Sequence, residues 1–174
     1  MNTKSKLLLV LLAALILFYF VFVEHLFETV SFDDGLEKIK EADEDFAGEN
    51  LVPQQSEELK EYNIELINLE KEFSGKKQDD NSKALLLLVK ARKELVLMQL
   101  NLIEVQEAVS CQEQIEAMDS VISSAEAARK TIQEYENKFS SLAEKTNEWN
   151  SNILDTTNSI ILSFRELKDQ KASC

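Results

Sequence analysis

A continuous 3-4 alternation of apolar residues between residues 88 and 109 is the feature that most restricts how this chain can fold. The residues of this alternation are Leu88, Ala91, Leu95, Met98, Leu102, Val105 and Val109. Apolar residues at this spacing lie along one face of an α-helix. Six more apolar residues widen the stripe, namely Leu85, Leu86, Leu87, Val89, Val96 and Ile103. The pattern therefore predicts a helix that neighbours cover on more than one side, as at the centre of a helical bundle.

The same spacing continues towards the C-terminus in a chain with very few helix-breaking residues. The 174 residues include 3 glycines and 1 proline, and all four lie between residues 35 and 75. One helix from residue 82 to the end would be about 140 Å long, and its wide apolar stripe would remain exposed without partner chains. Folding back of the chain on itself is therefore favoured. The sequence predicts an all-α fold in which an antiparallel bundle contains three long helices plus one or two shorter helices.

Two segments are suited to the turns of this bundle. Ser110 and Glu113 match the S-x-x-E capping box, in which both side chains bond to free amides at the start of a helix. Residues 144–152 contain three asparagines and only one apolar residue, and asparagine competes with helix through local side-chain bonds. We expect one turn just before residue 111 and a second near residues 145–152.

The N-terminal segment is apolar enough to enter a lipid bilayer. Every residue from Leu7 to Val23 is apolar or aromatic, and Leu26 and Phe27 extend the run. As a helix, residues 7–23 cover roughly 25 Å, near the lower limit for a bilayer core of about 30 Å. A cleaved signal peptide is the alternative, but the run is longer than the usual apolar core and no A-x-A-like site follows it. We predict a single transmembrane helix over residues 7–27.

The flanking charges give this helix an orientation. Lys4 and Lys6 precede the span, whereas the first cations after it are Lys38 and Lys40. Because cations are retained on the cytoplasmic side, we expect a single-pass protein of the cell membrane with its N-terminus in the cytoplasm. Residues 1–6 are then a cytoplasmic tail, residues 28–55 a membrane-proximal linker with a short amphipathic helix, and residues 56–174 an extracytoplasmic helical bundle.

The composition argues against several classes of function. The chain has 32 acidic and 19 basic side chains, a formal net charge of -13, so it does not offer the clustered cations that nucleic-acid binding needs. It has 1 histidine and 2 cysteines, and it contains no nucleophile, metal or phosphate-loop motif. We expect no enzyme, no catalytic residue, no cofactor and no metal; an enzyme would need a site made of carboxylates alone.

One acidic segment invites comparison with a calcium loop. Asp43, Asp45 and Gly48 fall at positions 1, 3 and 6 of an EF-hand-like loop, but position 12 is Gln54 and Pro53 precedes it. The bidentate carboxylate that calcium needs at position 12 is therefore missing. We interpret this segment as a solvated acidic face.

The two cysteines are candidates for a disulfide. If one helix runs from about residue 112 to the second turn and the next returns to the C-terminus, Cys111 and Cys174 meet at the same end of the bundle. Outside the cytoplasm such a bond persists. The alternative is two unpaired thiols, one at a helix end and one at the terminus.

Three aromatic residues lie near the second predicted turn. Tyr135, Phe139 and Trp149 are candidates for an interaction tip, and packing in the core or the turn is the alternative.

Together these features predict a membrane-anchored extracytoplasmic helical bundle that acts as a structural or protein-interaction module, a scaffold or adaptor. Its partners would be membrane lipid, through the N-terminal helix, and another protein or a second copy in a coiled-coil assembly. The alternative is a ligand-sensing or solute-binding ectodomain without its own cytoplasmic output domain, because helical bundles can open pockets between helices.

Overall fold

The computed structural model describes Tyr19 and residues 29–47 and 56–171. Its elements are α2 (Phe32–Ala47), α3 (Ser56–Ser74), α4 (Asp80–Glu107), α5 (Cys111–Lys138), α6 (Ser140–Ala143), the 3-10 helix η1 (Glu144–Thr146) and α7 (Asn147–Lys171). No strand occurs among the described residues, and the predicted all-α class is confirmed.

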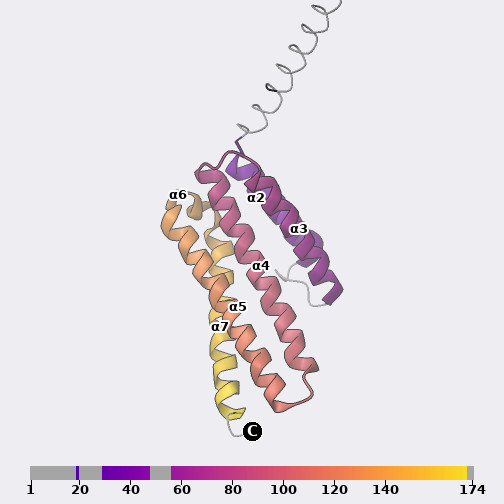
Figure 1. Ribbon diagram of the computed structural model, residues 1–174. Helices are drawn as coiled ribbons and strands as arrows, with labels where there is room; N and C mark the ends of the chain where they lie inside the picture. The colour runs from indigo at the N-terminus through magenta and orange to yellow at the C-terminus, as the bar shows by residue number, and fades with distance from the viewer. Residues whose placement is uncertain (1–18, 20–28, 48–55, 172–174) are drawn as a thin grey trace, which may run out of the picture.

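The helices form an up-and-down bundle (Figure 1). α4 and α5 make a long hairpin, and α7 returns along α5. α2 and α3 form a second, shorter pair that packs on the other side of α4. α4 therefore takes the central position that its wide apolar stripe predicts.

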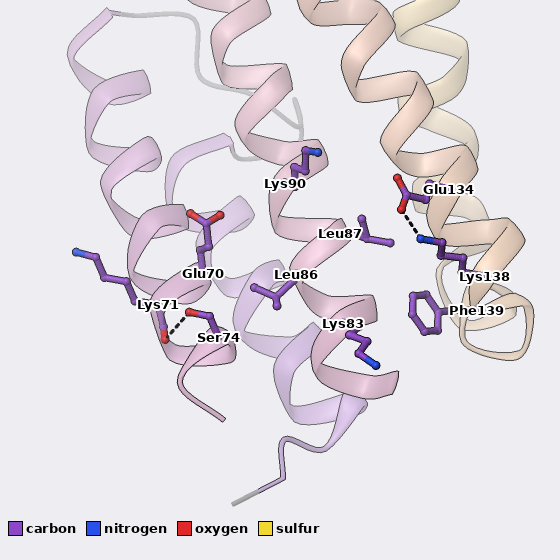
Figure 2. A pocket seen from close by; sticks show the side chains of 10 residues that line it. All are labelled: Glu70, Lys71, Ser74, Lys83, Leu86, Leu87, Lys90, Glu134, Lys138 and Phe139. Atoms are coloured by element: carbon purple, nitrogen blue, oxygen red, sulfur yellow. Dashed lines mark hydrogen bonds and ion pairs between the residues drawn. The ribbon is translucent and has the colours of Figure 1, made fainter. Parts of the chain in front are cut away.

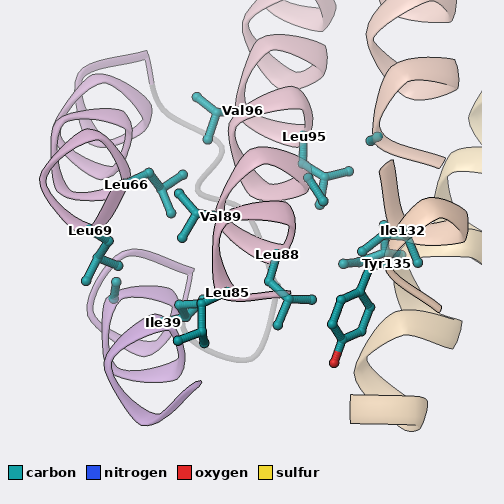
Figure 3. Close-up of a cluster of buried hydrophobic side chains, with 14 of the residues drawn as sticks. Ile39, Leu66, Leu69, Leu85, Leu88, Val89, Leu95, Val96, Ile132 and Tyr135 are labelled. Carbon is teal, nitrogen blue, oxygen red and sulfur yellow. The ribbon is translucent and has the colours of Figure 1, made fainter. Parts of the chain in front are cut away.

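Buried side chains of α4 face neighbours on both sides (Figure 3). Leu85, Val89 and Val96 point towards α2 and α3, where Ile39 and Leu66 meet them. On the other side, Leu88 and Leu95 point towards α5 and are joined there by Ile132 and Tyr135. Burying such side chains stabilises a fold by roughly 1.5–3 kcal/mol each, so the contacts of α4 hold the two helix pairs together.

The first predicted turn is confirmed. The hydroxyl of Ser110 accepts a hydrogen bond from the backbone N–H of Glu113, and the Glu113 carboxylate accepts one from the backbone N–H of Ser110. This capping box satisfies amides that have no partner within α5, and it fixes where that helix begins.

The second turn was predicted too far along the chain. α5 ends at Lys138, α6 and η1 make the turn, and α7 has already begun at Asn147. The asparagines that suggested a turn are part of the helix. Asn150 is buried and donates a hydrogen bond at 3.1 Å to the hydroxyl of Thr146, four residues earlier, so burial and this local bond outweigh its weak preference for helix.

Gly35 lies within α2, where that helix crosses α4 closely. A Cβ atom on Gly35 would come within 2.3 Å of a methyl carbon of Leu85, which is itself fully buried. The absence of a side chain therefore permits this crossing.

The segment predicted as a membrane-proximal linker contains α2. Phe32, Leu36, Ile39 and Ala42 are buried along one face of this helix, which packs against α3 and α4. α2 thus belongs to the bundle.

Among the described residues, none of the helices combines the length and the apolar character needed to cross a membrane. The structure therefore gives no support to the predicted transmembrane helix, and residues 7–27 lie outside the described residues apart from Tyr19.

The ends of α5 and α7 that carry the predicted disulfide lie together. Lys171 of α7 donates a hydrogen bond to Gln114 of α5, and Lys168 pairs with Asp119. Cys111 is disulfide-bonded. Cys174 lies outside the described residues, so its pairing with Cys111 stays a prediction.

Candidate functional site

A buried ion pair lies at the junction of α2, α3 and α4. The Nε of Arg92 is 3.0 Å from Oδ2 of Asp43, and the Arg92 side chain is 1% exposed. The Tyr62 hydroxyl donates a hydrogen bond to the other carboxylate oxygen of Asp43. Three helices thus contribute one charged or polar group each to a single cluster in the core.

Burial dominates the electrostatics of this cluster. It raises the pKa of Asp43 above its ordinary value, although the charge of Arg92 and hydrogen bonds from Tyr62 and Trp149 favour the carboxylate. It lowers the pKa of Arg92, although the attraction of Asp43 opposes that change. Burial and the nearby Asp43 charge also raise the pKa of Tyr62. Each charge therefore depends on the other, and loss of one would leave its partner unpaired in the core.

α7 closes the cluster from the outside. The Trp149 ring lies over the Arg92 guanidinium, with the central carbon of that group 3.5 Å from the ring centroid. Nη1 and Nη2 of Arg92 are buried and have no hydrogen-bond partner among the described residues. The stacked ring contributes a cation-π contact where these donors are not hydrogen-bonded.

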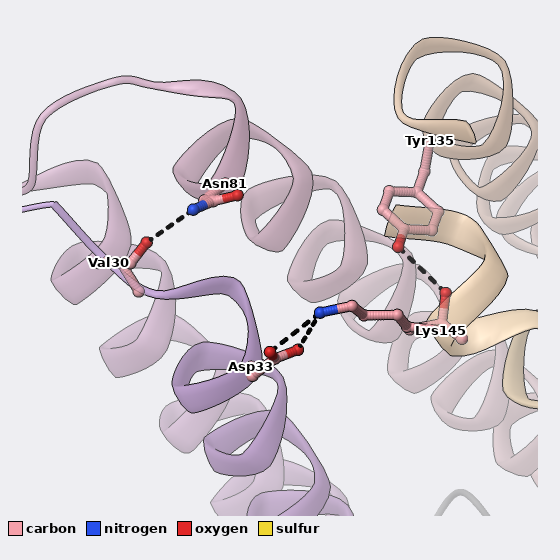
Figure 4. A network of polar contacts seen from close by, with 6 residues as sticks. Val30, Asp33, Asn81, Tyr135 and Lys145 are labelled. Carbon is pink, nitrogen blue, oxygen red and sulfur yellow. Dashed lines mark hydrogen bonds and ion pairs between the residues drawn. The ribbon is translucent and has the colours of Figure 1, made fainter. Parts of the chain in front are cut away.

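Polar contacts also tie the start of α2 to the turn between α5 and α7 (Figure 4). Lys145 of η1 bonds to both carboxylate oxygens of Asp33, at 2.7 and 2.9 Å. Asn81 at the start of α4 donates a hydrogen bond to the backbone oxygen of Val30 at 3.3 Å. The hydroxyls of Tyr135 and Thr146 lie 3.1 Å apart. The end of the bundle where α2 begins is therefore held by contacts between segments distant in sequence.

The interpretation of Asp43 as part of a solvated acidic face was wrong. It is 5% exposed and lies in a helix with Arg92 as its partner. Gly48, the third residue of the calcium comparison, lies outside the described residues. Within the described ranges, no cluster of three or more His, Cys, Asp or Glu side chains is placed to hold a metal ion.

A groove over α4 is the candidate site for binding a partner (Figure 2). It has a volume of about 680 Å³, it is open to solvent, and its walls come from α3, α4 and α5. Leu86 and Leu87 form its floor, and Phe139 adds an apolar ring at one end. The remaining lining residues are Glu70, Lys71, Ser74, Lys83, Lys90, Glu134 and Lys138. We refer to these ten residues as the lysine groove.

The charge of the lysine groove is opposite to that of the whole chain. Four lysines and two glutamates line it, in a protein with a net charge of -13. Both glutamates are paired: Glu134 with Lys138 at 2.6 Å, and Glu70 with Lys93, outside the groove, at 2.7 Å. The hydrogen bond and charge of Lys138, together with the charge of Lys90, lower the pKa of Glu134. The groove therefore presents an excess of positive charge.

Lys71, Lys83 and Lys90 carry this excess, and Lys83 and Lys90 both lie on α4. Both are exposed, and neither forms an ion pair within the described part of the chain. Figure 2 shows them on α4, one on each side of Leu87 along the helix. Their spacing of seven residues corresponds to two helical turns, about 10 Å along the axis. An apolar side chain thus lies between two available cations.

The three aromatic residues predicted as an interaction tip have different environments. Tyr135 is fully buried, whereas Phe139 lines the lysine groove and its ring centroid is 6.3 Å from that of Tyr135. Trp149 stacks on Arg92 and borders a separate hollow of about 330 Å³ beside α2 and η1. Phe139 is the one of the three that the structure places in the lysine groove.

Sequence reasoning did not find Lys83, Lys90 or Arg92. The position of Arg92 was a usable signal, because it lies four residues after Leu88 and three before Leu95 on the stripe that the core buries. The two lysines gave no such signal, because their importance depends on where α3 and α5 lie.

The fold and the groove define this chain as a helical-bundle protein with an open, apolar-floored groove. Comparisons with protein-family models, with curated proteins and with solved structures found no match to it.

Proposed function

We propose that this protein is a membrane-anchored interaction module that binds a partner protein in the lysine groove. Residues 7–27 hold it at the cell membrane as a single pass with the N-terminus in the cytoplasm, and the bundle lies outside the cytoplasm. The observation that carries the proposal is the composition of the groove. Half-buried leucines on its floor and an aromatic ring at one end, with charged side chains around them, match the apolar core and polar rim of a protein interface.

A ligand-binding role is the second candidate, because the groove volume of about 680 Å³ falls within the range of small-molecule pockets. Such pockets, however, bury most of the ligand surface, about 70–90% of it. A groove open to solvent leaves much of a small ligand exposed but suits one face of a helix. The shape of the groove therefore favours a protein partner.

Site-specific photo-crosslinking in the native cells tests the proposal. A photoreactive amino acid replaces Leu87 in the groove or, as the control, Ile64, which is 58% exposed on α3 outside the groove. We expect one discrete adduct from position 87 and none of that size from position 64. The partner is then identified by mass spectrometry and must bind the purified full-length chain. Equal labelling from both positions, or no adduct from position 87, contradicts the proposal.

Extraction tests the anchor separately. We expect the full-length chain to stay with the membrane fraction in alkaline carbonate and the bundle to be cleaved by protease added outside intact cells. Release into the carbonate supernatant would contradict the predicted span.

A further inference from the structure

The spacing of charge and apolar surface in the lysine groove defines what can bind there. Lys83 and Lys90 are seven residues apart on one helix, and Leu87 lies between them. A second helix has the same repeat, because residues seven apart return to nearly the same face after two turns. A helix lying along α4 can thus place one carboxylate at each lysine and an apolar residue over the leucine.

We propose, building on the proposed function, that the partner presents an acidic amphipathic α-helix that lies in the lysine groove along α4. Its binding face has carboxylates at positions i and i+7 and apolar residues at i+3 and i+4. The carboxylates pair with Lys83 and Lys90, and the apolar residues pack on Leu86, Leu87 and Phe139.

Three observations select this occupant. The groove is open along the bundle and is bordered by α3 and α5, so it resembles the space that a further helix would fill. Both of its glutamates already have lysine partners, which leaves Lys71, Lys83 and Lys90 for an external anion, and the last two lie on one helix. The rest of the protein is strongly acidic, so this groove is where an acidic partner meets the least repulsion.

The chain itself is a less suitable occupant. A second copy would bring another acidic chain, with a net charge of -13, against the first. Repulsion between the two copies opposes this arrangement, whereas a separate acidic helix carries much less charge.

The test uses designed peptides and the full-length chain held in zwitterionic lipid nanodiscs. The probe is a fluorescent helical peptide of about 18 residues, long enough to form helix. It carries Glu at i and i+7 and Leu at i+3 and i+4. The control peptide has the same composition, with both glutamates moved off the binding face. Fluorescence anisotropy should show binding of the probe, and the control should bind roughly tenfold more weakly, because two ion pairs are lost.

Charge reversal in the protein provides the matched test. K83E/K90E should weaken binding of the probe by roughly tenfold or more, because two attractions become repulsions. K40E/K60E changes the net charge by the same amount outside the groove and should leave binding unchanged. A peptide with Lys at i and i+7 should bind K83E/K90E better than it binds the wild-type chain.

Several results would overturn the assignment. Equal binding of the probe and the control peptide would show that the seven-residue register is irrelevant. Displacement of the probe by palmitate or by phosphatidylserine vesicles would make a lipid anion the occupant. Self-association that is lost in K83E/K90E would make it a second copy. If all peptides fail while the adduct from position 87 persists, the partner chemistry is wrong and the interaction function stands.

Discussion

The two ends of the bundle are stabilised in different ways. At the five-helix end (α2, α3 and residues 80–98, 121–138 and 147–157), the core contains Tyr62, Phe73 and Arg92, all of which are 1% exposed or less. At the three-helix end (residues 99–120 and 158–171), the buried side chains are Ala117, Met118 and Ile161. This end also has a disulfide at Cys111, a capping box and an exposed ion pair between Lys168 and Asp119. A large core with a buried ion pair distinguishes the five-helix end, whereas the three-helix end combines a smaller core with a covalent link.

Among the changes predicted, removing the buried cation should cause the largest loss in the free energy of unfolding. We expect Arg92→Ala to lower the free energy of unfolding by about 3–5 kcal/mol, because Asp43 stays buried without its partner. Arg165→Ala, at the three-helix end, breaks the exposed pair with Glu126 of α5 and should cost about 1 kcal/mol or less. Urea denaturation of the full-length chain measures both values.

A triple variant separates the charge from the packing. Replacing the whole cluster with apolar side chains, as in Asp43→Leu, Tyr62→Phe and Arg92→Met together, should recover most of the stability lost in Arg92→Ala. Similar losses for Arg92→Ala and Arg165→Ala would remove the distinction between the two ends.

Reduction of the disulfide should act mainly on the three-helix end. If Cys111 is paired with Cys174, replacing both cysteines with serine should lower the free energy of unfolding by about 2–4 kcal/mol. Hydrogen exchange should accelerate at residues 111–120 and 160–171, with little change around Arg92. Reductant should add nothing further to the double variant. Two free thiols in peptide maps of the unreduced protein would contradict the pairing.

Crowding the crossing of α2 and α4 should weaken the five-helix end by a smaller amount. The methyl group of Gly35→Ala meets Leu85, and overpacking of this kind costs about 1–3 kcal/mol. The better helix propensity of alanine offsets about 1 kcal/mol of this cost, so we expect a net loss of about 0–2 kcal/mol. In a double-mutant cycle with Leu85→Ala, the two losses should be less than additive. Simple additivity would show that the two positions do not share space.

Acid should have the smallest effect, and at the three-helix end it should act at the start of α5. Hydrogen bonds from the backbone and hydroxyl of Ser110, and from the backbone of Val109, lower the pKa of Glu113 below its ordinary value of 4.5. A depressed carboxyl pKa contributes stability that is complete above the ordinary value and is lost as the pH falls through the folded value. Amide exchange at residues 109–113 should accelerate over that range, and Glu113→Gln should remove this dependence. An NMR titration of Glu113 at its ordinary pKa would contradict the prediction.

The sequence was most informative where a structure depends on local spacing. The 3-4 alternation predicted α4 and its central position because apolar periodicity directly determines which face of a helix is buried. The S-x-x-E pattern located the start of α5 for the same reason: its two residues bond to each other's backbone.

Contacts between distant helices were the part that sequence did not reveal. Asp43 stood among other acids, and nothing in that run distinguishes the one carboxylate that meets Arg92 in the core. Asn150 suggested a turn because its burial depends on the helices packed around it, which the sequence does not place. The sequence also does not reveal the lysine groove, because Lys83 and Lys90 border one surface only when α3, α4 and α5 are in place.

The ties at the start of α2 also affect how the bundle responds to mechanical load. Asn81 bonds to Val30, and Lys145 bonds to Asp33, so the entry point of the chain is connected to α4 and to η1. A force applied at residue 30 is therefore carried by α2, α4 and η1 together. α2 separates from the bundle only after these hydrogen bonds break. A bundle tethered at this end would unfold as a unit under such a force.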